Sequence, residues 1–177
     1  MKKMFCTVLA VLMVLGCMFA FTGCNGNKPT TSQKPAIPAG YVEYNDGNIS
    51  FAYPQAWTKT DGSVTVLAGT NGNNVTVTYE AKTDMYENMT IETFISTMVP
   101  AFSMMGLSVS NISIVKAKVN NVDVVKMAFT TSASGVSMSQ TIYCVNVAER
   151  TYSVTVTEVQ KDAALVSNVY NTLYVVK

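Results

Sequence analysis

The chain has 177 residues, and its 12 basic residues less Lys2 and Lys3 of an expected export signal leave 10 against 11 acidic residues, a net charge of −1. A domain this close to neutrality has no electrostatic attraction for nucleic acid, which is therefore excluded as a partner. No histidine occurs in the sequence, which excludes catalysis by a Ser-His-Asp or Cys-His arrangement and metal sites that need imidazole ligands.

Residues 1–23 have the pattern of an export signal. The basic start Met-Lys-Lys precedes an almost wholly apolar run over residues 4–21, and Thr-Gly-Cys follows it. A basic start, an apolar run and small residues before the cleavage site describe a secretory signal. The end of the run resembles the lipobox of bacterial lipoproteins, which implies cleavage before Cys24 and a diacylglycerol thioether on its sulfur. We therefore expect a palmitate-type lipid anchor on Cys24 and a location on the extracytoplasmic face of the cell membrane.

Two alternatives to this interpretation are weaker. An uncleaved membrane helix over residues 4–21 would be nearly long enough to span a bilayer, but it leaves the Thr-Gly-Cys sequence at its end unexplained. Lipid attachment at Cys17 would place the bulky Leu15 where a small residue is expected, and it would leave an apolar stretch on the mature protein.

Residues 24–40 comprise the lipidated cysteine and a polar segment that holds three of the five prolines. Because such a composition has little to bury, we expect a disordered or partly extended tether. A flexible chain of this length spans on the order of 20 Å on average, which would let the domain stand away from the membrane.

The remaining residues, 41–177, are expected to form one domain. Alternating apolar and polar residues predict strands over residues 48–53, 63–68 and 74–79. A helix is predicted from an N-cap at Thr90 to a C-terminal cap at Gly106, with Pro100 kinking it or ending a turn. Its apolar face at helical spacing consists of Ile91, Phe94, Ile95, Met98 and Phe102.

The second half of the domain is rich in valine, isoleucine, threonine and tyrosine. It predicts strands over residues 109–119, 122–131, 136–147 and 151–159, and the short breaks between them predict an antiparallel meander. A closing helix over residues 161–173 would bury Leu165, Val166, Val169, Tyr170 and Leu173. The order βββαββββα predicts an α+β domain in which an antiparallel sheet of about six to seven strands packs with two main helices.

Residues 49–57 read Ile-Ser-Phe-Ala-Tyr-Pro-Gln-Ala-Trp, a strand that ends in an aromatic-proline pair with a tryptophan three residues later. Together with the element order, this segment resembles the PsbP-like fold, which includes photosystem extrinsic subunits, the Ran-binding Mog proteins and bacterial lipoproteins of the DcrB and LpqN type. Asn120 and Asn121 stand where these domains often carry an Asn-Gly hairpin. The resemblance covers nearly all of residues 41–177. It implies a domain that binds protein partners or supports a membrane-bound assembly, with no catalytic motif to carry over.

Several residues have both a functional and a structural interpretation. Phe51, Tyr53 and Trp57 would suit an aromatic ligand platform, although packing between sheet and helix is favoured. Cys144 is alone in the expected mature domain apart from Cys24, and no histidine can activate it, so it is interpreted as a small buried apolar residue.

Five methionines cluster around the first predicted helix, and packing is their favoured interpretation. An adaptable partner-binding groove is the alternative, whereas a Cu(I) site lacks any supporting histidine or cysteine pair. These methionines are Met85, Met89, Met98, Met104 and Met105. Asp84 and Glu87 lack the loop spacing of a calcium site and are interpreted as solvated surface groups.

The sequence therefore favours a non-enzymatic, membrane-anchored lipoprotein whose domain binds a protein or another envelope component. Residues 84–106 are the favoured binding face, and the uncovered face of the sheet is the alternative. A small-molecule carrier is the second hypothesis, and it needs a pocket of about several hundred Å³ between sheet and helix. A hydrolase or transferase would need an Asp/Glu or Ser-Lys pair, for which no motif is present. No cofactor or metal is expected, and the oligomeric state stays open.

Overall fold

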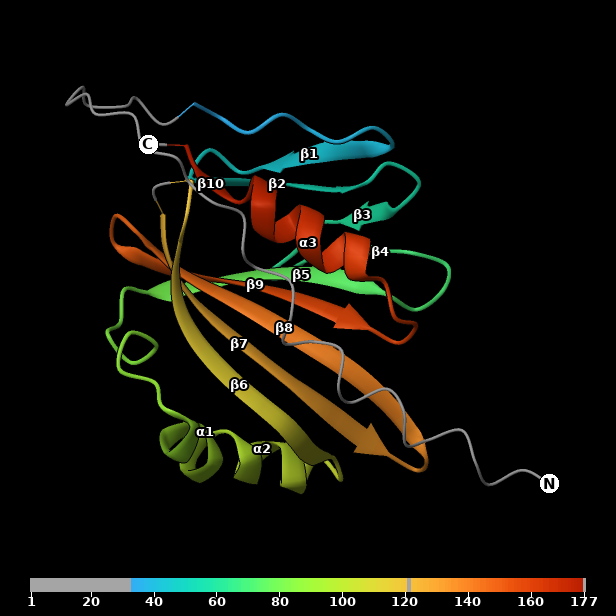
Figure 1. Ribbon diagram of the computed structural model, residues 1–177, viewed down its shortest axis with the longest axis vertical. Coiled ribbons are helices and arrows are strands. Elements are labelled where there is room, and N and C mark those ends of the chain that lie inside the picture. The colour runs from blue at the N-terminus through green and yellow to red at the C-terminus, as the bar shows by residue number, and fades with distance from the viewer. Residues whose placement is uncertain (1–32, 121, 177) are drawn as a thin grey trace, which may run out of the picture. The chain divides into compact units, whose positions relative to one another are not determined.

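Two antiparallel sheets and three helices make up the computed structural model, which describes residues 33–120 and 122–176 (Figure 1). The larger sheet has the strand order β3-β4-β5-β9-β8-β7-β6, and the smaller has the order β1-β2-β10. The large-sheet strands are β3 (Thr58–Thr60), β4 (Thr65–Ala68), β5 (Asn74–Ala81), β6 (Ser108–Val119), β7 (Val122–Ala133), β8 (Val136–Val147) and β9 (Arg150–Glu158). The other elements are β1 (Tyr41–Asn45), β2 (Ile49–Pro54), β10 (Tyr174–Val175), α1 (Ile91–Thr97), α2 (Val99–Met104) and α3 (Ala163–Thr172).

The predicted α+β class with an antiparallel sheet is confirmed, and so is the meander from β6 to β9. The structure adds three short strands that the sequence did not predict, namely β1, β3 and β10. Because β2 pairs with β1 and β10 rather than with the large sheet, the first predicted strand belongs to a second sheet. β3 and β10 have three and two residues, which is too few to show alternation in the sequence, so their partner strands decide whether they form.

The first predicted helix is divided into α1 and α2 at Met98. Pro100 lies in the first turn of α2, where its missing N–H breaks no hydrogen bond. Thr90 caps α1 as predicted, because its side chain accepts a hydrogen bond from the Thr93 N–H at 3.1 Å. Gly106 ends the segment as predicted, since its φ of 75° suits the turn in which the Leu107 N–H donates to the Phe102 carbonyl.

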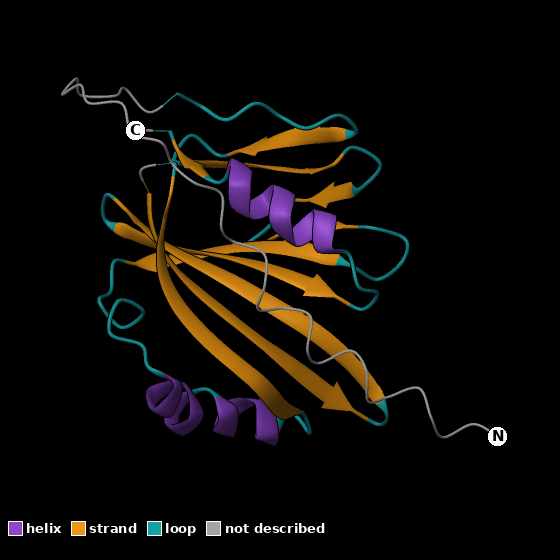
Figure 2. Ribbon diagram, viewed as in Figure 1, coloured by secondary structure: helices purple, strands orange, loops and turns teal. Residues whose placement is uncertain are grey.

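The two faces of the large sheet are covered by different helices (Figure 2). The first core lies where α3 and the small sheet pack on one face, and it includes Val75, Tyr152 and Leu165. The second core lies where α1 and α2 pack on the other face, and it includes Phe94 and Phe129. The second face is open over β5 and β9, which present threonines there because their valines point into the first core.

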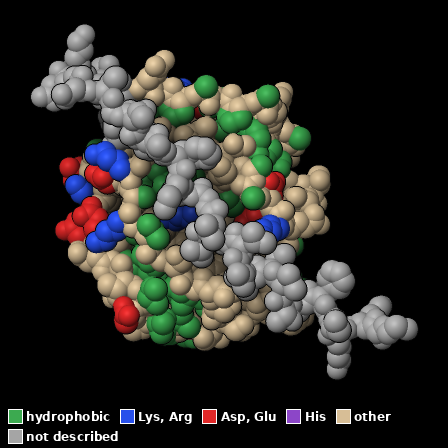
Figure 3. Space-filling model, in the orientation of Figure 1, with side chains coloured by type: hydrophobic (Ala, Val, Ile, Leu, Met, Phe, Trp, Pro, Cys, Tyr) green, Lys and Arg blue, Asp and Glu red, His purple; other side chains and the backbone are tan. Residues whose placement is uncertain are grey.

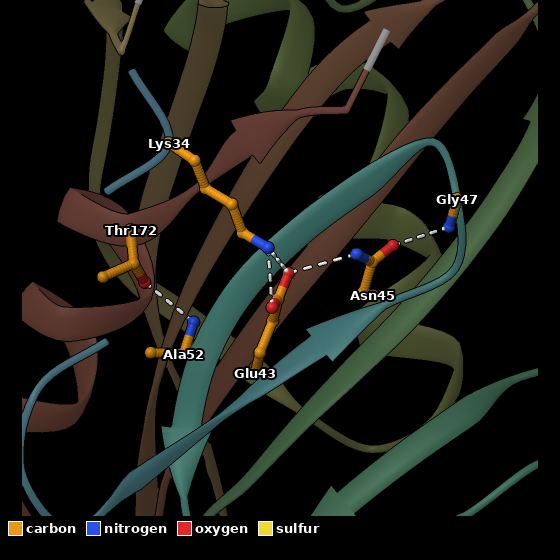
Figure 4. A network of polar contacts seen from close by, with 6 residues as sticks. All are labelled: Lys34, Glu43, Asn45, Gly47, Ala52 and Thr172. Atoms are coloured by element: carbon orange, nitrogen blue, oxygen red, sulfur yellow. Dashed lines mark hydrogen bonds and ion pairs between the residues drawn. The ribbon is translucent and has the colours of Figure 1, made fainter. Parts of the chain in front are cut away.

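α3 is attached to the small sheet by the hydroxyl of Thr172, which is buried (Figure 4). The hydroxyl accepts a hydrogen bond from the Ala52 N–H at 2.7 Å and donates to the Asn168 carbonyl at 2.5 Å. The predicted buried stripe of this helix is confirmed for Leu165, Val169 and Leu173, which are fully buried. Val166 and Tyr170 are only partly buried and pack against the first core.

Residues 33–40, which the sequence assigned to the tether, contact the small sheet. The Lys34 amino group lies 2.7 Å from Oε2 of Glu43 and 2.6 Å from Oε1 (Figure 4). The hydrogen bond from Lys34 lowers the pKa of the Glu43 carboxyl. The earlier part of the predicted tether, the signal peptide and Cys24 lie outside the described residues. Across residues 33–120 and 122–176, none of the helices combines the length and apolar character that a bilayer-crossing segment needs.

We predict that Thr172→Val destabilises the protein by ~1–3 kcal/mol, because it leaves the buried Ala52 N–H without an acceptor while keeping the volume of the side chain. Thr172→Ser is the matched control, since it keeps the hydroxyl and loses one methyl group, at a cost of about 1 kcal/mol or less. Urea unfolding of both variants measures the difference. Equal stability of the two would show that the hydroxyl contributes nothing.

Candidate functional sites

An exposed apolar surface lies along α1 and α2, and we call it the α1–α2 surface. Ile91 and Ile95 lie one turn apart on α1 and are 41% and 49% exposed. Met104 and Met105 at the end of α2 are 84% and 64% exposed, and Met85, in the segment before α1, is 44% exposed. Hydrophobic side chains gather in the lower part of Figure 3, where α1, α2 and the adjacent end of β6 lie.

The α1–α2 surface exists because α1 and α2 pack through only a few aromatic side chains. The ring of Phe129 on β7 lies 5.1 Å from that of Phe94 and 5.3 Å from that of Phe102. Of the apolar face predicted for this segment, Phe94 is buried whereas Ile91 and Ile95 are exposed. A seven-residue helix that rests on Phe94 and Met98 buries a narrow stripe, so the flank carrying the two isoleucines faces solvent.

The methionine cluster divides into two groups. Met89 is buried and Met98 packs against the second core, so the packing interpretation is confirmed for these two. That interpretation is wrong for Met85, Met104 and Met105, whose thioethers are exposed. A flexible, polarisable side chain that faces solvent adapts readily to a partner, so the exposed group fits the groove interpretation that the sequence left open.

The aromatic motif packs into the first core, as favoured from the sequence. Phe51 is fully buried and stacks on Tyr44 with ring centroids 4.8 Å apart. Tyr53 is buried in the same core, and Trp57 packs against it. A side chain at position 69 would come within 2.6 Å of the Trp57 indole nitrogen, which explains why Gly69 stands there.

A second candidate site is a fork in the large sheet that the sequence did not predict. The ladder between β7 and β8 ends at the pair Val125–Cys144. Beyond it, β7 still pairs with β6 as far as Val122, and β8 still pairs with β9 as far as Val147. Figure 1 shows the upper ends of β6 and β7 rising toward β10 while β8 runs to the side. We call the gap between residues 122–124 and residues 145–147 the fork.

A pocket of about 800 Å³ occupies the fork. Apolar side chains of Val122, Val124, Val125 and Val175 line it, together with charged side chains from β6 and β7. Its polar wall is an ordered network, in which the Asn146 amide donates to Glu87 Oε1 at 2.6 Å and accepts from the Thr151 hydroxyl at 2.5 Å. Glu87, expected to be a solvated surface group, is exposed but fixed by this contact.

Cys144 lies at the closed end of the fork and is 3% exposed, which confirms that it is a buried residue. Burial raises the pKa of its thiol from an ordinary value of 9.0 to about 12. Burial, and then the charge of a Cys144 thiolate, raise the pKa of Tyr86 to about 12. A thiol in this environment stays protonated at neutral pH and is a poor nucleophile.

We predict that Cys144 contributes to a loss of stability at alkaline pH. The unfolded thiol ionises near pH 9 and the folded thiol near pH 12, so the stabilising contribution is complete below pH 9 and is lost as the pH rises toward 12. Urea midpoints measured between about pH 7.5 and 10.5 should therefore fall less steeply for Cys144→Ala than for the wild type. If the urea midpoints of the two proteins fell in parallel with pH and differed only by a constant, Cys144 would not be the group responsible.

Among residues 33–120 and 122–176, no three histidine, cysteine, aspartate or glutamate side chains gather as a metal site would require. Asp84, the other acidic residue weighed for calcium, is exposed, and its carbonyl accepts hydrogen bonds from Asn88.

No family model matches the sequence, and no curated protein matches it in sequence. The fold is similar to the solution structure of cyanobacterial PsbP (CyanoP) from Synechocystis sp. PCC 6803, with a TM-score of 0.58, 14% identity, and coverage of 84% of this chain and 99% of that chain. A crystal structure from Bacteroides thetaiotaomicron VPI-5482 gives a TM-score of 0.49 and 12% identity, over 76% of this chain and 48% of that chain.

The likeness to CyanoP shows that this protein has a PsbP-like fold. Its class is thus an α+β domain with a PsbP-like fold, an exposed apolar helix surface and a forked sheet. A fold shared at such low identity assigns no activity, so a function has to be argued from the two candidate sites.

Proposed function

We propose that this protein is a non-enzymatic lipoprotein, anchored by Cys24 to the extracytoplasmic face of a bacterial cell membrane, whose domain binds a protein of the cell envelope. The observation that carries the binding role is the α1–α2 surface, where Met104 and Met105 are 84% and 64% exposed. Fully burying a side chain of this kind contributes ~1.5–3 kcal/mol, so a partner that covers the surface gains affinity from each one.

The character of the α1–α2 surface supports a protein partner. A contiguous exposed apolar patch on a soluble domain marks an interaction site more often than chance, and methionines let such a site repack around its partner. Two carboxylates, Glu87 and Glu92, and no basic residue lie between Met85 and Leu107. A surface without basic residues has no attraction for anionic lipid headgroups, which favours a protein over the membrane itself.

The absence of catalysis is supported by two properties of the chain. No histidine is present in the sequence to serve as a general base. The buried thiol of Cys144 has a pKa raised to about 12, which keeps it in the unreactive form.

A small-molecule carrier is the second candidate function, and the pocket in the fork is the observation that favours it. The spaces between the sheet and the helices, where this hypothesis requires a pocket, are filled by the side chains of the two cores. A carrier would therefore have to use the fork.

We predict that Cys24→Ala abolishes the lipid anchor. In a bacterial host grown with an alkyne-labelled palmitate, the wild type should incorporate the label and partition into the detergent phase, because two or more acyl chains hold a protein at a membrane. The Cys24→Ala variant should stay unlabelled and in the aqueous phase. Cys17→Ala is the matched control and should behave as the wild type. Label retained by Cys24→Ala and lost from Cys17→Ala would move the attachment to Cys17.

We predict that replacing Met104 and Met105 together by serine weakens partner binding at least about tenfold, since two exposed apolar anchors are lost. The same change should leave the free energy of unfolding, measured in urea, within about 0.5 kcal/mol of the wild-type value, because exposed residues contribute little to folding. A photo-crosslinking residue placed at Ile95 in living cells identifies the partner, whose affinity is then measured with purified proteins.

Val64→Ser is the control for this experiment, since Val64 is 38% exposed on the turn between β3 and β4. It removes a similar apolar side chain from another part of the domain. Partner affinity that falls equally for Val64→Ser, or that stays unchanged for the double serine variant, would remove the α1–α2 surface as the binding site.

A further inference from the structure

The fork has two arms, residues 122–124 of β7 and residues 145–147 of β8. The edges of the two arms that face each other have no strand partner. Continuing the register beyond Val125–Cys144 would pair residues 122–124 of β7 with residues 145–147 of β8, but no such pairs form. Each arm is nevertheless held in extended form by its outer neighbour, β6 or β9. Alternate residues of a strand direct their backbone groups to opposite sides, so the residues whose backbone groups face the pocket without a ladder are Asp123 on one arm and Asn146 on the other.

Specific side-chain contacts hold the fork open. Asn120, at the tip of the β6–β7 hairpin with a φ of 48°, donates from its side-chain amide to the carbonyls of Asn171 at 2.9 Å and Leu173 at 3.0 Å. These bonds hold the β7 arm at the C-terminal end of α3. The β8 arm is fixed on the other side by the bond between Asn146 and Glu87. The opening is thus built into the fold and is not a frayed end.

The walls of the fork fit a neutral occupant with apolar side chains. Four valines line the pocket, and they come from β7 and β10. The charged residues that line it are Lys116, Lys118, Glu87 and Asp123, which sum to zero. Lys118 lies 3.9 Å from Asp123, and Glu87 accepts from Asn146, so both carboxylates already face partners within the chain.

We propose that the fork binds an extended peptide segment of a partner protein, which enters as an additional strand and pairs with the inner edge of β8 at residues 145–147. An extended backbone supplies donors and acceptors at the spacing that a strand edge requires, and its alternate side chains enter apolar pockets on the two faces of the sheet. A compact small molecule would fill the volume but would not present donors and acceptors at the spacing of the backbone groups of Asp123 and Asn146. None of the exposed side chains of α1 and α2 lines the fork, so the inference goes beyond the proposed function and is tested apart from it.

The experiment is hydrogen–deuterium exchange of the full-length lipidated protein in detergent micelles. The probe is the capped neutral pentapeptide Thr-Val-Thr-Val-Thr, which forms strands readily and carries no charge. Its matched control is the same pentapeptide with N-methylated backbone amides, which keeps the side chains and removes the donors. Laurate serves as a small apolar ligand without a peptide backbone.

Bound peptide should slow amide exchange at residues 122–125 and 144–147 by the factor 1 + [L]/Kd, which is ~4-fold when the peptide is at about three times its Kd. The N-methylated peptide and laurate should give no protection there. The variant in which Met104 and Met105 are serine should show the same protection as wild type, which separates a failure at the fork from a failure at the α1–α2 surface.

Protection that is absent with the pentapeptide would overturn the proposal. Equal protection by the N-methylated peptide or by laurate would also overturn it, and would assign the fork to a small-molecule carrier instead. Protection that appears at the outer edge of β3 or β6 rather than in the fork would show edge pairing elsewhere and would contradict the assigned site.

Discussion

The alternation of side chains along β8 is the constraint on which the rest of the structure depends, because this strand contributes to both cores. Tyr143 and Val145 point into the core under α3, whereas Ile142 and Cys144 point into the core under α1 and α2. A shift of one residue in register would exchange the two sets and spoil both cores. The pairing of β8 with β7 and β9 is therefore fixed from two sides, and the helices find their positions on a sheet whose faces are already determined.

The two helical layers that cover this sheet differ in how firmly they are held. α3 has ten residues, buries Leu165 and Val169 completely, and is capped by Asp162, whose side chain accepts from the Leu165 N–H at 2.9 Å. α1 and α2 together contain one fully buried side chain, Phe94. Elements with few buried apolar contacts open at low free energy. The layer that exposes its methionines is thus also the layer best able to adjust to a partner.

Elements with a local sequence signal could be predicted from the sequence. Elements that form only because a partner strand lies beside them could not. The long strands, the Thr90 cap and the α3 stripe follow from alternation, hydrogen-bonding chemistry and helical spacing. By contrast, β10 has two residues and forms only because β2 is adjacent. The exposure of Ile91 and Ile95 depends on how far a short helix rotates about Phe94, which spacing alone does not specify. The fork was missed for the same reason, since β7 and β8 keep their strand character after their pairing ends.

Asn120 has both a local role in its turn and a role in tertiary packing. Asparagine tolerates the positive φ that a tight hairpin requires, and that property is visible in sequence. Its amide also reaches the C-terminal carbonyls of α3, which is a property of the assembled first core. The open end of the fork belongs to the core under α3, which includes Val122 and Val147, whereas its closed end at Val125 and Cys144 belongs to the core around Phe129. Because the closed end of the fork and the α1–α2 surface share this second core, a change near Phe129 that loosens one site is expected to disturb the other.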